Sequence, residues 1–246
     1  MNKPLFPGSR KEEGSVMCTR YYMELSPELR PIIEEARRSP LTAKMISSLG
    51  RPLKTEGEIR PTDIAPVIAP NGRGVRTVYP MVWGFNMPDK ENTKRSKPLI
   101  NARMESANYK QTFRDSWARR RCIIPASYYY EWDHVPYVPY SEKGISQPMS
   151  SRRVGIRYAI QPEGETVTYL AGLYRMEEDE RCNFPHFTVL TREPVDGEVK
   201  RIHDRMPVIL SPDTIDKWIS PWTDLLKLKE IAWNSLTDMV CEKQKY

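Results

Sequence analysis

The chain has 246 residues, of which 39% are hydrophobic and 28% are charged. This is the composition of a globular protein with a sizeable core, and it excludes a disordered or fibrous chain. No apolar run approaches the roughly 20 residues that span a bilayer, so we expect no transmembrane helix and no membrane association. The formal net charge of +6 permits a polyanionic partner such as nucleic acid but does not establish one.

The cysteines indicate the cellular compartment and the absence of a metal centre. The four cysteines (Cys18, Cys122, Cys182 and Cys241) form no CxxC pair, and no other metal-ligand spacing is present. We therefore expect neither a metal nor a cofactor. Residues 1–17 also lack the apolar centre of a secretory signal, so we expect reduced thiols and a cytoplasmic protein.

The predicted elements are short, because the chain has 22 prolines against 12 glycines. An irregular segment at 1–16 precedes a strand at 18–25, and Ser26-Pro27 predicts the start of a helix that reaches about residue 38. In chain order we then expect a helix at 41–49, an extended segment at 60–70, a strand at 78–85, a polar loop at 87–98, a short extended piece at 99–103 and helical residues at 105–119.

The second half is predicted to be richer in strands. We expect strands at 121–124, 127–132, 154–160, 167–174, 184–191, 206–210 and 236–241, a surface excursion at 135–153, and helices at 214–219 and 224–232. Strands greatly outnumber long helices, and most do not alternate with helices as in βαβ units. The expected fold is therefore α+β, one domain around a curved, mainly antiparallel sheet.

Only three histidines could take part in chemistry. His134 lies in a loop-like context and reads as a surface residue, whereas His186 opens an apolar strand and reads as structural. His203 lies in the run 202–207, Ile-His-Asp-Arg-Met-Pro, which combines an imidazole, an acid and a base directly before an apolar strand. Such strand entrances often line active sites, so His203 is the candidate functional histidine.

Asn101 and Arg103 are two residues apart on a short extended piece, so their side chains share one face. An amide beside a guanidinium can hold a phosphate or a carbonyl oxygen. The residues alone favour the simpler alternative, an edge-strand cap next to a solvated arginine.

Glu131 stands between aromatic residues in the run 127–132. A carboxylate enclosed by rings tends to have a raised pKa and can act as a general acid. The default alternative is that strand alternation turns Glu131 to solvent while Tyr130 and Trp132 face the core.

Cys18 directly follows an internal methionine, Met17. Removal of the preceding residues would leave a thiol and an α-amine on adjacent carbons. Both groups titrate near pH ~8, so both are partly nucleophilic at neutral pH. Such an aminothiol condenses with an aldehyde to a thiazolidine, which an internal cysteine cannot do. The alternative is a buried strand cysteine.

These clusters, in this order, resemble the SOS-response-associated peptidase (SRAP) family of abasic-site processing proteins. The matching pieces are Met17–Arg20, Trp83–Phe85, Asn101–Glu105, Pro125–Trp132 and His203–Pro207. None is decisive alone, but five in the right order are highly specific. The resemblance runs from Met17 to about Trp218 and more weakly to the end. It implies an SRAP-like domain at 17–246, an open barrel with flanking short helices, preceded by an extension at 1–16.

The resemblance also implies a reaction. Such proteins bind single-stranded DNA at an abasic site, and the terminal cysteine links to the ring-opened sugar aldehyde through a thiazolidine that shields the lesion. Cys18 would supply the thiol and the amine, and Asn101 would hold the amino terminus or the sugar. Glu131 would act as acid and base, and His203 would assist proton transfer and reversal.

The resemblance assigns four further residues to DNA binding. Arg103, helped by Arg20, would hold phosphate, whereas Trp83 and the loop around Pro61 would stack against bases beside the lesion. We expect a monomer that associates with the nucleoid when it is bound to DNA. Two other functions stay open, a cysteine-type peptidase acting on other proteins through Cys18, and a non-catalytic nucleic-acid-binding module.

Three features depart from the family pattern. Thr19 stands where a glycine is usual, and Tyr128 where a glycine or smaller residue is usual; both are expected to adjust backbone packing. The third departure is residues 1–16, which block the Cys18 amine. Either self-cleavage removes them or translation starts at Met17. We favour the second, because residues 11–13, Lys-Glu-Glu, can be encoded AAG-GAG-GAG, which contains a ribosome-binding sequence.

Overall fold

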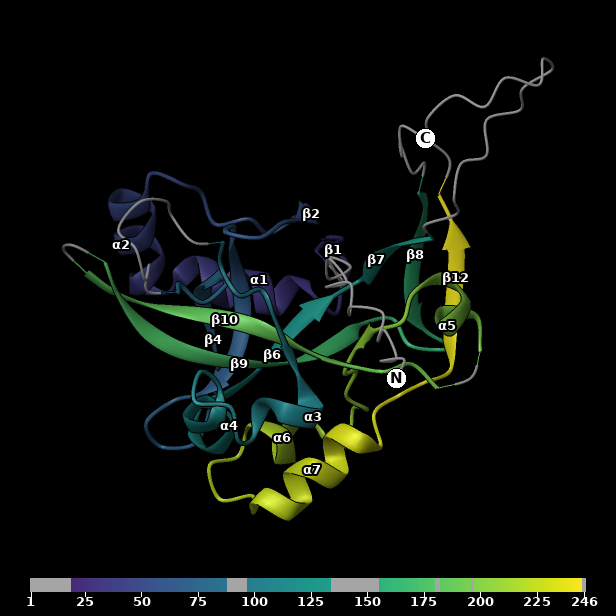
Figure 1. Cartoon of the computed structure of the whole chain (residues 1–246). Helices are drawn as coiled ribbons and strands as arrows, with labels where there is room; N and C mark the ends of the chain where they lie inside the picture. The colour runs from purple at the N-terminus through teal and green to yellow at the C-terminus, as the bar shows by residue number, and fades with distance from the viewer. Residues whose placement is uncertain (1–18, 88–96, 134–154, 180–181, 196, 245–246) are drawn as a thin grey trace, which may run out of the picture.

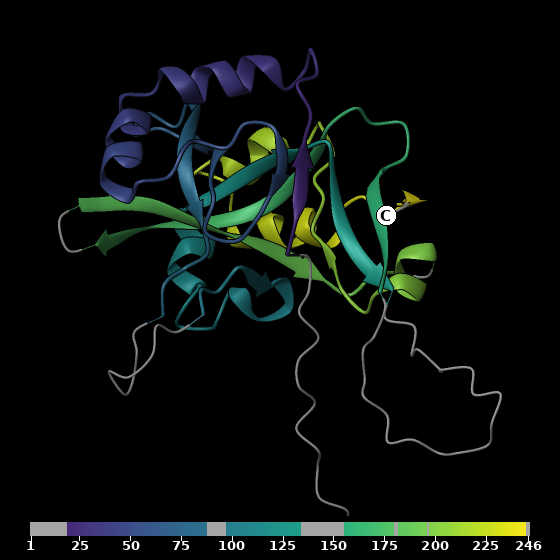
Figure 2. The same ribbon diagram turned by 90° about the horizontal axis from the view of Figure 1, so that it is seen from above.

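The computed structural model describes residues 19–87, 97–133, 155–179, 182–195 and 197–244. Figures 1 and 2 show two orthogonal views of the described elements. The predictions made for residues 1–16, Cys18, His134, the surface excursion and most of the loop at 87–98 lie outside the described residues.

A closed ring of strands forms the centre of the molecule. It contains β3 (Ile64–Pro70), β4 (Arg76–Trp83), β6 (Arg121–Ala126), β9 (Thr168–Asp179) and β10 (Cys182–Arg192). β4 pairs with β3, β3 with β6, β6 with β9 and β9 with β10, all antiparallel, and the parallel pair of β10 with β4 closes the barrel. Two short strands, β5 (Asn101–Arg103) and β11 (Met206–Pro207), extend the barrel along β10.

A second, fully antiparallel sheet stands beside the barrel (Figure 1). Its order is β12 (Met239–Lys243), β8 (Ile156–Pro162), β7 (Tyr128–Asp133), β1 (Tyr21–Met23) and β2 (Gly57–Ile59). Only Ser127 separates β6 from β7, so the chain passes directly from the barrel into this sheet. The α+β fold on mainly antiparallel, curved strands is thus confirmed.

Short helices cover the strands. α1 (Arg30–Arg38) and α2 (Pro40–Leu49) pack against β4, whereas α6 (Ile215–Ile219) packs against β6 and α7 (Leu225–Trp233) against α6. Figure 1 shows the two pairs on opposite sides of the barrel. The remaining helices are α3 (Met104–Ala107), α4 (Arg114–Arg119) and α5 (Glu198–Ile202). None of the helices in the described part of the chain is long and apolar enough to cross a membrane.

Several predicted boundaries differ from the structure. The first helix begins at Arg30, because the Ser26 hydroxyl accepts the Leu29 amide at 3.2 Å and forms a separate turn ahead of it. The helical residues at 105–119 divide into α3 and α4. The elements β2 and α5 were not predicted, since three and five residues are too few to show a period.

Candidate active site

The chain next to Cys18 is held against β7. Tyr21 and Tyr22 pair with Tyr129 and Tyr128, and the Tyr130 amide donates to the Arg20 carbonyl at 3.0 Å. The pairing of β1 with β7 therefore continues at least to Arg20, two residues after Cys18.

Glu131 is buried on β7, with 2% of its surface exposed. The default expectation from alternation is wrong: Glu131 points to the buried face together with Tyr129, whereas Tyr130 and Trp132 occupy the opposite face. On that opposite face arginines lie against the Tyr130 and Trp132 rings, and β7 as a whole packs against α5. A carboxylate buried in this way is costly unless hydrogen bonds or a function maintain it.

His203 ends α5, and its side chain is only 2% exposed. Its Nδ1 lies 3.1 Å from the Arg205 amide and 2.9 Å from Asp204 Oδ1. These two contacts require opposite protonation states of Nδ1. The Arg205 amide can donate only to an unprotonated Nδ1, whereas the Asp204 carboxylate can accept only from a protonated one. The amide proton is fixed covalently, and the Asp204 side chain is 74% exposed to competing water, so we assign Nδ1 as the acceptor. Neutral His203 then carries its proton on Nε2.

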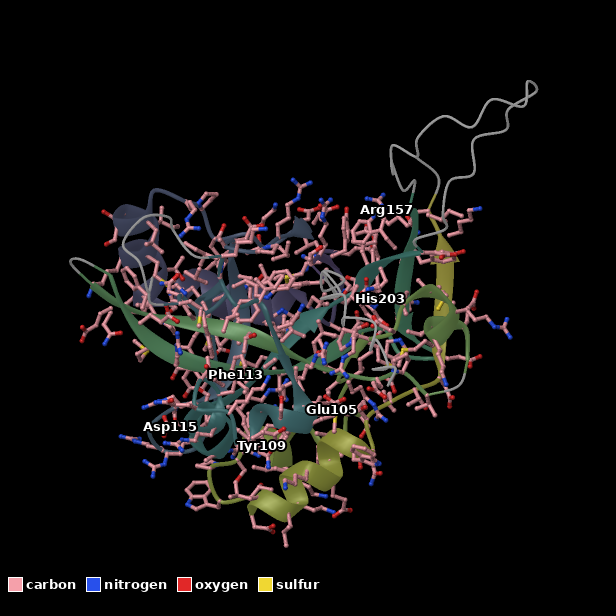
Figure 3. The ribbon with its side chains drawn as sticks, viewed as in Figure 1. Glu105, Tyr109, Phe113, Asp115, Arg157 and His203 are labelled. Carbon is pink, nitrogen blue, oxygen red and sulfur yellow. The ribbon has the colours of Figure 1, made fainter. Side chains whose placement is uncertain are left out.

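The buried acid and the buried imidazole lie on neighbouring elements. α5, which ends at His203, packs against β7, which carries Glu131 (Figure 3). Two of the predicted catalytic residues thus come from strands and helices in direct contact. The contact between these elements depends on a fold that brings α5 against β7, far apart in the sequence.

Asn101 and Arg103 lie on β5, which runs parallel to β10. Ala102 between them is 1% exposed, so the two flanking side chains share the opposite face, as predicted. Arg103 is exposed and Asn101 is half-buried. The start of this strand is fixed at the Ile100 carbonyl, which accepts the Trp83 indole N–H and the Val189 amide, each at 3.0 Å.

The predicted base contact through Trp83 does not fit the structure. Trp83 is 0% exposed, and its ring packs on Phe187 with centroids 5.9 Å apart and on Tyr21 at 5.3 Å. A base could reach the indole only by displacing these rings. Trp83 instead supports Asn101 from inside, through its hydrogen bond to Ile100.

Gly84 places the residues that lead into β5. Its φ is +115°, and a Cβ atom here would lie 2.7 Å from the Cβ of Pro98, so only glycine fits. Phe85 and Leu99 then exchange backbone hydrogen bonds of 3.0 and 2.8 Å. His186 Nδ1 lies 2.8 Å from the Gly84 carbonyl, and burial lowers the pKa of His186, in agreement with a structural role.

Pro61 occupies a tight turn beside Trp83. The Asp63 amide donates to the Arg60 carbonyl at 3.0 Å, and Thr62 has a φ of +75°, which together define a type II turn with proline at its second position. The Thr62 amide donates to the Trp83 carbonyl at 2.8 Å. Pro61 is half-buried, so this turn, unlike Trp83, presents a surface to a ligand.

Sequence reasoning missed the contact that joins two of the motifs. Arg205 donates through both terminal nitrogens to Glu105, at 2.8 and 2.9 Å. Partial burial alone would raise the pKa of Glu105, but the Arg205 hydrogen bonds and charge, with backbone hydrogen bonds, outweigh it and lower the pKa. No local pattern could reveal a pair 100 residues apart.

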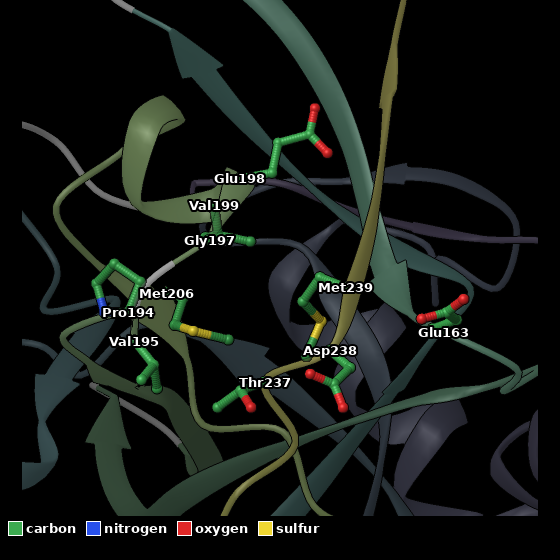
Figure 4. A pocket seen from close by; sticks show the side chains of 10 residues that line it. All are labelled: Glu163, Pro194, Val195, Gly197, Glu198, Val199, Met206, Thr237, Asp238 and Met239. Carbon is green, nitrogen blue, oxygen red and sulfur yellow. The ribbon is translucent and has the colours of Figure 1, made fainter.

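A cavity of about 220 Å³ lies between α5, the end of β8 and the start of β12 (Figure 4). Glu163, Glu198 and Asp238 line it together with Met206 and Met239, and no lysine or arginine is among its lining residues. Such a wall repels phosphate, so this cavity does not suit nucleic acid. The part of the chain that the structure describes also holds no cluster of three His, Cys, Asp or Glu side chains that could bind a metal ion.

Comparison with known proteins completes the description of the site. Residues 17–242 match the profile of the family described as SOS response associated peptidase (SRAP). The abasic site processing protein YoaM of Bacillus subtilis is 33% identical over 141 residues, which is 56% of this chain and 55% of YoaM. The abasic site processing protein YedK of Escherichia coli is 26% identical over 155 residues, 62% of this chain and 60% of YedK. These matches thus span little more than half of each relative.

Solved structures agree with the fold. A crystal structure of a protein from Bacteroides thetaiotaomicron superposes with a TM-score of 0.66 at 19% identity, over 93% of this chain and 92% of that chain. A phage-related protein from Bordetella bronchiseptica gives 0.64 at 20% identity, over 93% and 95% of the two chains.

Proposed function

Because this chain belongs to the SOS response associated peptidase (SRAP) family, we propose that it recognises abasic sites in single-stranded DNA and captures them covalently through Cys18. Its relatives YoaM and YedK are named abasic site processing proteins. The observation that carries the proposal is the buried pair of titratable groups, Glu131 and His203, on elements in contact, with β7 paired to the chain next to Cys18.

The proposed reaction is a condensation. The Cys18 α-amine attacks the aldehyde carbon of the ring-opened sugar, water leaves, and an iminium forms. The Cys18 sulfur then adds to the same carbon and its proton passes to nitrogen, so the thiazolidine forms with the loss of one water. The steps need a donor for the departing hydroxyl and an acceptor for the amine proton. Arg20, two residues after Cys18 in the sequence, is hydrogen-bonded to β7, the strand that carries Glu131.

Each remaining role has a matching side chain. Glu131, buried on β7 next to the chain that leads to Cys18, supplies the acid and base. His203 transfers protons through Nε2, since Nδ1 is engaged by the Arg205 amide, and it promotes reversal of the link. Asn101 holds the amino terminus or the sugar. No metal or cofactor is required by this scheme.

DNA is held by the polar rim of the site in this proposal. Arg103 is exposed on β5 and suits a phosphate. Arg20, directly before β1, assists it in phosphate binding. Pro61 provides the surface against which a base beside the lesion rests. Binding should weaken with salt, because arginine–phosphate contacts release counterions.

The chemistry requires a free amine on Cys18. Residues 1–17 must therefore be absent from the reactive form, either because translation starts at Met17 and the methionine is removed, or because the protein cleaves itself. A monomeric state, a cytoplasmic location and nucleoid association stay predictions.

The test uses the form that starts at Met17 and a single-stranded oligonucleotide with one abasic site. We expect a protein–DNA band that survives denaturing electrophoresis with the wild type and is absent for Cys18→Ala. Cys241→Ala is the matched control, because burial, reinforced by Glu198, raises the pKa of Cys241 to about 11 and leaves little thiolate. A band that persists in Cys18→Ala contradicts the proposal. Cleavage of added peptides would instead favour a peptidase.

A further inference from the structure

Aromatic side chains line the face of the second sheet opposite to the one that buries Glu131. Tyr22 on β1 stands directly opposite Tyr128 on β7 and directly opposite Glu58 on β2, so all three side chains share one face. The Tyr22 and Tyr128 rings stack in parallel, with centroids 5.0 Å apart and an interplanar angle of 6°.

The same face continues along β7. Tyr130 meets Tyr22 and Tyr128 edge-on, with centroids 6.3 and 5.4 Å away. The Arg157 guanidinium lies 4.6 Å above the Tyr130 ring, and that of Arg20 lies 5.3 Å from the Trp132 ring. In Figure 3 Arg157 lies toward the upper end of β8, whereas His203 lies lower, close to α5. We call these six residues, Arg20, Tyr22, Tyr128, Tyr130, Trp132 and Arg157, the aromatic face.

The cluster around Glu58, at one side of the aromatic face, carries an excess of positive charge. Glu58 receives contacts from three arginines, Arg20 at 2.8 Å, Arg60 at 2.7 Å and Arg157 at 3.6 Å. Three positive charges thus surround one negative charge, and the Arg60 side chain is 58% exposed. Since the carboxylate leaves an excess of positive charge, a phosphate can join the cluster without displacing Glu58.

The rings are arranged to meet a planar ligand. Tyr22, Tyr128 and Trp132 are half-buried, so part of each ring reaches the surface. Burial, followed by a hydrogen bond with Tyr130, raises the pKa of Tyr128, so its hydroxyl stays neutral and does not repel an anion. Rings and arginines together are the groups that hold the bases and phosphates of a single strand.

We propose that the aromatic face is a second contact surface for single-stranded DNA, where a nucleotide flanking the lesion stacks against Tyr22 and Tyr128 while its phosphate binds Arg60 and Arg157. The inference rests on the proposed function and extends it. Arg20 connects the two surfaces, because its carbonyl binds β7 next to Cys18 and its guanidinium belongs to the aromatic face.

The consequence is a dependence of affinity on strand length. A strand of about 4 nucleotides fills only the site around the lesion, whereas one of about 12 also reaches the aromatic face, which are lengths typical of single-strand binding surfaces. The test measures the affinity of undamaged, fluorescein-labelled strands of both lengths. The variants are the doubles Tyr22→Ala with Tyr128→Ala, and Tyr22→Phe with Tyr128→Phe.

We expect the alanine double to bind the longer strand about tenfold more weakly and the shorter strand as the wild type does. The phenylalanine double keeps both rings and should retain wild-type affinity. Arg60→Gln should lower the slope of log affinity against log salt by about one, whereas Arg38→Gln, an arginine 82% exposed on α1, should not change it. Unchanged affinity of the alanine double for the longer strand overturns the inference.

A measurement on the unaltered protein keeps the inference testable if the alanine double does not fold. 2-Aminopurine is placed in turn at each position of a strand of the longer length that carries one abasic site, and stacking on the tyrosines should quench its fluorescence at one or two positions away from the lesion. Equal fluorescence at every flanking position overturns the inference. The proposed function is tested separately on the wild type, because a wild type that forms no cross-link with abasic DNA contradicts the function alone.

Discussion

The Glu105 carboxylate on α3 and the Arg205 guanidinium, directly before β11, form a two-armed ion pair with nitrogen–oxygen distances of 2.8 and 2.9 Å. Arg205 is 4% exposed and also donates to the Thr191 carbonyl at 2.7 Å. Thr191 on β10 pairs with Arg103 on one side and with Pro207 on the other. Arg205 therefore connects the segment that bears Asn101 and Arg103 to the segment that bears His203. The ion pair thus maintains the separation between the two halves of the candidate site.

Glu105→Gln should therefore destabilise the fold. The substitution leaves the buried Arg205 charge without its counter-ion, which in a fully buried pair costs about 3–5 kcal/mol. Because the Glu105 side chain is 37% exposed, we expect a smaller loss of roughly 1–2 kcal/mol in the free energy of unfolding. Urea unfolding measures it. Glu230→Gln, in a surface pair with Lys227, is the matched control and should cost less than about 0.5 kcal/mol. Equal effects of the two variants would contradict the account.

The same pair predicts how stability depends on pH. The pKa of Glu105 is lower in the folded protein than its ordinary value of 4.5, so the folded state binds the proton less readily than the unfolded state. The contribution of ionised Glu105 to the free energy of unfolding is complete above pH 4.5. It is lost as the pH falls through the lower pKa of the folded state. The difference in stability between wild type and Glu105→Gln should accordingly shrink on acidification. A difference that grows between pH 6 and pH 3 would refute the role assigned to the ion pair.

Much of the fold could be predicted from the sequence because its cues are local. Alternating apolar residues located most strands, and Ser211-Pro212 and Asp224 located α6 and α7; the Asp224 side chain accepts the Leu226 and Lys227 amides. The barrel closure could not be predicted this way, since it depends on the parallel pairing of β10 with β4, which no turn between them specifies.

The residue types of the candidate site could be predicted from the sequence, but the directions in which the side chains point could not. Asn101 and Arg103 share a face because strand geometry requires it. The default orientation of Glu131 toward solvent and the base contact assigned to Trp83 were wrong, because which face of a strand is buried depends on the neighbouring sheet and helices. Glu58 gave no signal, and the partner of Arg205 could not be predicted, since the residues that these side chains contact are far away in the sequence.

The turn after β2 stores backbone strain at Thr62. A β-branched residue with a φ of +75° costs about 1–2 kcal/mol, whereas glycine tolerates this conformation. Thr62→Gly should consequently be more stable than Thr62→Ala by roughly 1 kcal/mol, because alanine keeps the strain. Thermal unfolding of the two variants isolates the backbone effect, and an alanine variant at least as stable as the glycine variant would show that the turn is unstrained.

Glu131→Gln should separate chemistry from binding. Loss of a general acid–base group slows the step by about 10²- to 10⁴-fold, so we expect cross-link formation with abasic DNA to slow within that range. Non-covalent affinity for undamaged single-stranded DNA should stay the same, because Glu131 is buried beneath the surface. Glu198→Gln on the exposed side of α5 is the control. A wild-type rate of cross-link formation in Glu131→Gln would show that Glu131 takes no part in the reaction.

The most direct test of the account is the intact mass of two proteins, one starting at Met1 and one at Met17, each mixed with a single-stranded oligonucleotide that carries one abasic site. The account predicts that the Met17 form loses its methionine and gains the mass of one oligonucleotide less one water. The Met1 form should gain this mass only if residues 1–17 have been removed from it. No gain of mass in either form would show that Cys18 does not capture the lesion.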